Sequence, residues 1–183
     1  MLFSVWMIVG FQAVWFACAW GMAHHYPLLP ILVGGVYLNT FIAKQPAKKS
    51  AYVFLAKVAL GGFILDSLLG WLGLISFQSP YGHPFDWLQP WWMLVLWLSF
   101  GASIEYSFSW LKKTSALVFM GLLGGPLAYL SGQKIGGIIR IDLYAYPFIG
   151  MTFAVILPYC MAILRKQSEH NPVPIESIEK TIS

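Results

Sequence analysis

The chain has 183 residues, of which 58% are hydrophobic and only 10% are charged, whereas soluble domains carry about 25% charged residues. Several apolar runs of roughly 20 residues follow one another, and each is long enough to cross the hydrocarbon core of a bilayer. These properties exclude a soluble globular domain, and the continuous runs exclude a membrane β-barrel, whose strands alternate. The net charge of +4 lies at loops and ends, so it reports on topology and lipid contact rather than on nucleic-acid binding.

Six apolar segments are expected to be membrane spans. In chain order they cover residues 2–22, 28–43, 51–77, 91–111, 115–131 and 143–164. Residues 79–90 contain three prolines and a glycine, which leaves no room for a helix and predicts a loop. The sequence therefore predicts an all-α integral membrane protein, a bundle of about six transmembrane helices. Its membrane domain covers residues 1–164, and a disordered cytoplasmic tail covers residues 165–183.

The distribution of basic residues predicts the orientation of these spans. If the N-terminus is cytoplasmic, 8 of the 11 Lys and Arg residues lie on the cytoplasmic side, as the positive-inside rule requires. These eight residues are Lys44, Lys48, Lys49, Lys112, Lys113, Arg165, Lys166 and Lys180. Tryptophans and tyrosines gather at the opposite ends of the spans, where aromatic belts form. We therefore expect both termini in the cytoplasm, an N-in, C-in topology.

Three ionisable residues fall within the predicted spans, and such residues are candidates for function because charge is costly in a bilayer. Two of them, Lys57 and Glu105, each lie roughly 9 Å from the cytoplasmic end of their span, at about 1.5 Å per residue. Equal depth on consecutive spans predicts an ion pair between them. The alternative is that Lys57 extends to the lipid headgroups while Glu105 meets water or a serine.

Asp66, the third ionisable residue, lies roughly 22 Å from the start of its span, at or beyond the middle of the membrane. Gly62, Asp66 and Gly70 are spaced four residues apart, which places them on one face of a helix. Small residues on that face let a neighbouring helix approach, and a buried carboxyl needs a hydrogen-bond partner. Two interpretations stay open: a neutral carboxyl that joins two helices, and a site that handles protons, ions or substrate.

A glycine-rich run at residues 121–137 interrupts the fifth span. Gly125 and Pro126 lie within it, and because proline removes a backbone hydrogen bond, we expect the helix to be kinked and unwound there. Gly125 and Tyr129 are four residues apart, so they share a face that is expected to pack on the neighbouring spans. A buried tyrosine hydroxyl needs a partner, and Asp66 is the partner that we expect for Tyr129.

Three histidines, His24, His25 and His83, fall on the predicted outer side and form weak candidates for a metal site. Adjacent histidines point about 100° apart on a helix, which disfavours joint coordination by the first two. No histidine lies within a span, and no lysine lies in the last span. Neither a b-type haem nor a retinal Schiff base is therefore expected, and we expect no cofactor.

Four motifs connect the chain to a known family. They are Gly62-x-x-x-Asp66-Ser67, Leu96-Trp97 with Phe100, Ser107 with Trp110-Leu111, and Gly-x-x-Gly-Gly-Pro-Leu-Ala-Tyr-x-x-Gly-x-x-x-Gly from 121 to 136. Together they resemble an uncharacterised family of small bacterial multi-pass inner-membrane proteins, a domain of unknown function, over all but the tail. The resemblance implies an association with genes for membrane-lipid modification, such as cyclopropane-fatty-acid-synthase-like methyltransferases, and for oxidative stress. The chain departs from the family at Glu105-Tyr106, where the family pattern has an uncharged polar pair.

Three functions fit this sequence. The first is an accessory or scaffold protein of a lipid-modification or stress-response system, without a catalytic centre, in which Asp66 serves packing. The second is a small transporter or lipid permease that uses Asp66 as a protonatable site near Pro126. The third is an intramembrane lipid-modifying enzyme that uses Asp66, Tyr129 or the outer histidines, although no nucleophile–base spacing supports it. We expect membrane lipids as partners, a lipid-modifying enzyme as a further candidate partner, and no nucleic acid.

Overall fold

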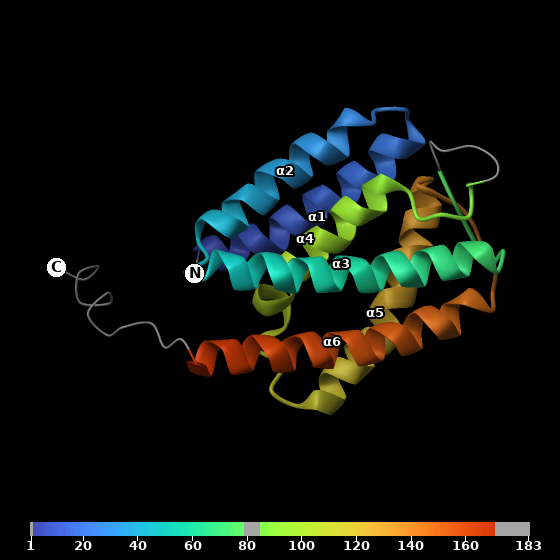
Figure 1. Cartoon of the computed structure of the whole chain (residues 1–183). Helices are drawn as coiled ribbons and strands as arrows, with labels where there is room; N and C mark the ends of the chain where they lie inside the picture. Colours follow the sequence, from blue (N-terminus) through green and yellow to red (C-terminus); the bar gives the residue numbers. More distant parts are fainter. Residues whose placement is uncertain (1, 79–84, 171–183) are drawn as a thin grey trace.

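Six helices and a short two-stranded sheet make up the described part of this computed structural model, residues 2–78 and 85–170 (Figure 1). The helices are α1 (Leu2–Ala23), α2 (Leu28–Ala43), α3 (Lys48–Trp71), α4 (Trp91–Phe108), α5 (Thr114–Ile135) and α6 (Ala145–His170). The strands are β1 (Ile75–Phe77) and β2 (Ile138–Ile141). The start of α1 and the end of α6 lie at the same end of the molecule (Figure 1).

Four helices, α1, α3, α5 and α6, are long and apolar enough to cross a membrane, which indicates a multi-pass membrane protein. Helix α2 is apolar but has only 16 residues, fewer than the roughly 20 that a bilayer needs. Helix α4 packs against α1, α2, α3 and α6, so its polar residues Ser99 and Ser103 are buried within protein. That all six helices span the membrane, and that both termini lie in the cytoplasm, remain predictions.

The predicted third span, residues 51–77, is wrong at its C-terminal end, because α3 stops earlier and β1 follows. Gly73 ends the helix with a φ of 69°, a left-handed conformation that glycine adopts without steric cost. The N–H groups of Leu74 and Gly73 donate to the carbonyls of Leu69 and Gly70, each at 2.9 Å. This is the Schellman arrangement, which satisfies the last carbonyls of a helix.

Helix α5 ends in the same way. Gly136 has a φ of 103°, and its N–H donates to the Gln133 carbonyl at 3.2 Å. Strand β2 then pairs antiparallel with β1, with Ile75 opposite Ile141. The glycines that end α3 and α5 thus direct the chain into a small sheet, at the end of the bundle opposite the start of α1 and the end of α6 (Figure 1). No strand was predicted there.

The α5 helix runs unbroken over Thr114–Ile135 with Pro126 inside it, so the predicted unwinding is wrong. A proline at this position releases the carbonyl of Leu122, four residues earlier. Gly150 of α6 lies against that carbonyl, since a Cβ atom on Gly150 would be only 2.9 Å from the Leu122 oxygen. Tight packing by a neighbouring helix is how membrane helices tolerate an internal proline without unwinding.

Helix α6 continues to His170, beyond the predicted end of the span at residue 164. No proline or glycine lies between these two positions, so nothing in the sequence stops the helix. The Arg165 guanidinium also donates to the Leu111 carbonyl at 2.6 Å, which ties this turn to the connection between α4 and α5. The rest of the predicted tail, residues 171–183, lies outside the described residues.

Candidate functional site

Asp66 lies on α3 in the interior of the bundle and has no exposed surface. Its Oδ1 atom accepts a hydrogen bond from the Tyr129 hydroxyl at 2.5 Å, and its Oδ2 atom accepts one from Trp97 Nε1 at 2.7 Å. These bonds join α3 to α5 and to α4. The first bond confirms the partner predicted for Tyr129, whereas Trp97 was not predicted to be a donor to Asp66.

Glycines on α3 allow this cluster to form. A Cβ atom on Gly62 would overlap the Trp97 indole, and a Cβ atom on Gly70 would overlap the Trp87 carbonyl. Both glycines lie on the same face as Asp66, as their four-residue spacing predicts. The face is therefore shaped to bring the Trp97 indole within hydrogen-bonding distance of the carboxylate.

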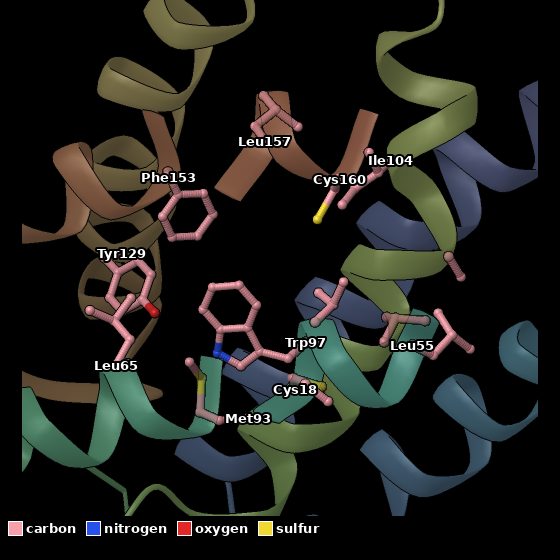
Figure 2. Close-up of a cluster of buried hydrophobic side chains, with 14 of the residues drawn as sticks. Cys18, Leu55, Leu65, Met93, Trp97, Ile104, Tyr129, Phe153, Leu157 and Cys160 are labelled. Carbon is pink, nitrogen blue, oxygen red and sulfur yellow. The ribbon is translucent and has the colours of Figure 1, made fainter. Parts of the chain in front are cut away.

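Phe153 of α6 belongs to the same cluster, although the sequence analysis did not single it out. Its ring centroid lies 5.2 Å from that of Trp97, stacked, and 6.2 Å from that of Tyr129, edge to face; both arrangements are favourable for aromatic pairs. Figure 2 shows the three rings converging, with the Trp97 nitrogen and the Tyr129 oxygen turned toward the same region. The buried side chains of α6 are spaced four residues apart, but this part of the chain is apolar on nearly all sides, so its sequence does not single out this face.

A cavity of about 510 Å³ lies beside this cluster, between α1, α4, α5 and α6, and its volume is typical of small-molecule sites. None of its described lining residues is charged. Gln12 on α1, with Leu127 and Ser131 on α5, are exposed lining residues, so the cavity opens between these two helices. The aromatic side chains of its wall include Phe11, Trp15, Trp92, Phe100, Phe108 and Phe153.

Trp97 and Tyr129 separate Asp66 from this cavity. Both residues line the cavity, while their N–H and O–H groups are bound to the carboxylate. Asp66 itself is completely buried and is not part of the cavity wall. A ligand in the cavity would therefore contact the aromatic rings and not the carboxylate.

The predicted ion pair between Lys57 and Glu105 is not formed. Among the described side chains of residues 2–78 and 85–167 neither residue makes a salt bridge. Lys57 is five residues before Gly62, so it points roughly 140° away from the α3 face that packs on α4. It is exposed and lies near Gln167 of α6, whereas Glu105 is half-buried on α4.

His24 and His25 do not form a metal site with other described side chains. His24 and His25 are exposed at the turn after α1. The His24 ring stacks on Trp20 with centroids 4.4 Å apart, and its Nδ1 donates to the Trp20 carbonyl at 2.9 Å. In the part of the chain that the structure describes, no group of three or more His, Cys, Asp or Glu residues could hold a metal. His83 lies outside that part.

Comparison with known proteins identifies the family of the chain. Residues 4–159 match a family model described as a protein of unknown function (DUF2878). The chain belongs to the DUF2878 family. No curated protein and no solved structure matches it. The DUF2878 match runs from α1 into α6, so it contains Asp66, its two hydrogen-bond donors and the whole cavity.

Proposed function

We propose that this DUF2878 protein is a non-catalytic accessory component of the bacterial inner membrane, which holds a membrane lipid and serves a lipid-modification or stress-response system. The observation that carries the proposal is the uncharged, aromatic cavity of about 510 Å³ that opens between α1 and α5. The connection to lipid modification rests on the family resemblance and its associated genes.

The chemistry of the cavity supports an apolar ligand. Aromatic side chains provide large apolar contact areas, and a wall without charge offers no compensation for the desolvation of an ion. Gln12 and Ser131 place hydrogen-bonding groups at the exposed edge of the cavity. An acyl chain among the rings, with its ester group near these two side chains, matches this distribution of polar and apolar groups.

The position of Asp66 disfavours the permease alternative. A protonatable coupling site must exchange protons or ions with the transport path, but Asp66 is shielded from the cavity by Trp97 and Tyr129. The enzyme alternative is also disfavoured, because the Tyr129 hydroxyl is engaged with Asp66. Both arguments favour a packing role for the carboxylate and a binding role for the cavity.

Filling the cavity tests the proposal. Gly124 lies in the cavity wall, and a Cβ atom there would meet nothing within 4 Å, so we expect the side chain of Gly124→Leu to occupy part of the cavity without displacing backbone. Gly61 on α3 also has nothing within 4 Å of a Cβ atom, and it is not part of the cavity wall. Gly61→Leu is therefore the matched control. Native mass spectrometry of the full-length protein is expected to show less co-purified lipid for Gly124→Leu and wild-type amounts for Gly61→Leu.

Equal lipid retention by the two variants would overturn lipid binding in the cavity. The accessory role is tested in a deletion strain under oxidative stress, by measuring its lipid composition after complementation. Wild type and Gly61→Leu are expected to restore the composition, whereas Gly124→Leu is not. A deletion that leaves the lipid composition unchanged would contradict the connection to lipid modification.

A further inference from the structure

A second, smaller pocket lies between α3 and α6, at the end of the bundle where α1 begins and α6 ends (Figure 1). Its volume is about 210 Å³. Its polar residues are Lys49, Ser50 and Lys57 of α3 and Gln167 of α6, and its apolar residues are Val53, Phe54 and Ile163. None of these residues belongs to the aromatic cavity, so the two sites are separate.

The two lysines lie on one face of α3. Lys49, Val53 and Lys57 are spaced four residues apart, which places them in a row along the helix. The Cα atoms of the two lysines are about 12 Å apart along the axis, at about 1.5 Å per residue. Side chains on a helix tilt toward its N-terminus, so the Lys57 amine is directed back toward Lys49 and toward the end of the bundle.

Neither lysine is neutralised by the described protein. Among the side chains that the structure describes, residues 2–78 and 85–167, neither Lys49 nor Lys57 makes a salt bridge, and both are exposed. The groups that α6 places at the pocket, Ile163 and Gln167, carry no charge. A lysine within an apolar span is costly unless it reaches the interface or pairs with an anion, so this arrangement favours an anion between the two amines.

We propose that this pocket binds the phosphate group of an anionic phospholipid. Lys49 and Lys57 would hold the phosphate from both sides, Gln167 would donate a hydrogen bond to it, and the acyl chains would lie along Val53 and Ile163. Basic pockets between membrane helices bind anionic headgroups through this combination of charge and apolar contact. The site does not depend on the function proposed for the aromatic cavity.

The test measures the affinity of the purified full-length protein in detergent for phosphatidylglycerol, by native mass spectrometry. Each lysine near a membrane surface contributes about a fivefold increase in binding to anionic lipid, so Lys49→Gln/Lys57→Gln is expected to bind about 25-fold more weakly. The matched control is Lys112→Gln/Lys113→Gln, which removes the same charge from the connection between α4 and α5. Its affinity is expected to fall much less, because neither Lys112 nor Lys113 lines the pocket.

Three results would overturn the proposal. An equal loss in the two double variants would mean that only the overall charge of this end attracts lipid. Displacement of phosphatidylglycerol by millimolar inorganic phosphate would assign the site to free phosphate. Equal binding of phosphatidylglycerol and phosphatidylcholine by wild type would contradict a preference for anionic lipid. This comparison uses wild type alone, so it does not depend on whether the Lys49/Lys57 variant folds. Lys57→Arg keeps the charge and is expected to retain binding.

Discussion

Removing the Asp66 carboxylate is expected to destabilise the bundle strongly. In Asp66→Ala the Trp97 N–H and the Tyr129 O–H, both of which now donate to Asp66, lose their partner although both side chains are buried. An unsatisfied buried polar group costs about 1–3 kcal/mol, so the two groups together cost about 2–6 kcal/mol. Asp66→Asn keeps the shape, and its amide can accept from Trp97 and donate to the Tyr129 oxygen. We expect it to cost only about 1 kcal/mol.

Thermal unfolding of the full-length protein in detergent measures this difference. For a chain of 150–250 residues, 1 kcal/mol corresponds to a shift in Tm of about 2–4 °C. Asp66→Ala is thus expected to lower Tm by about 4–24 °C, and Asp66→Asn by about 2–4 °C. Tyr129→Phe should destabilise wild type more than it destabilises Asp66→Ala, because contacting residues typically couple by about 0.5–3 kcal/mol.

Two results would refute this reasoning. If Asp66→Ala and Asp66→Asn lower Tm equally, the hydrogen bonds to the carboxylate do not determine its contribution to stability. If Asp66→Asn keeps its Tm but fails to restore lipid composition in cells, the negative charge has a direct function. That outcome would favour the permease over the accessory role.

Paired glycine substitutions test the packing of the helices, again by Tm in detergent. Gly62→Ala is expected to destabilise the protein by about 1–3 kcal/mol, because its Cβ atom would overlap the Trp97 indole, and overpacking costs about that much. Gly61→Ala on the same helix meets nothing within 4 Å and should be neutral or stabilising by up to about 1 kcal/mol. On α5, Gly121→Ala should destabilise by at least as much as Gly62→Ala, since its Cβ atom would overlap the backbone of α6. Gly124→Ala has open space and should behave as Gly61→Ala does. Equal Tm values within either pair would contradict the observed packing.

Helix periodicity explains which parts of the site could be predicted. The four-residue spacing of Gly62, Asp66 and Gly70 identifies one face of a helix, and a mid-span carboxyl demands a donor. Tyr129 was a foreseeable donor because it is a polar side chain in an apolar span. The role of Trp97 as a donor to Asp66 could not be predicted, because every tryptophan of the chain has the same indole N–H. Only the arrangement of the helices shows which tryptophan reaches Asp66.

The errors in the fold have local causes. Residues 75–77 are as apolar as the helix before them, so hydropathy extended the span into β1, and the decisive signal was the single Gly73 with its positive φ. The helix at Pro126 was expected to unwind because a proline is disruptive in isolation. Its neighbour Gly150 packs against the released carbonyl, and a contact between distant segments is invisible in a local pattern.

Trp97 and Tyr129 each contact both Asp66 and the cavity, and so connect the two. Their polar edges bind the carboxylate, and this fixes the rings that line the cavity. Once Asp66→Ala releases them, both rings can rotate into the cavity, so this variant is expected to retain less co-purified lipid although Asp66 does not contact the ligand. Asp66→Asn should retain wild-type amounts, measured by native mass spectrometry at a temperature where all variants are folded. Full lipid retention by a folded Asp66→Ala would show that the carboxylate stabilises the bundle without shaping the cavity.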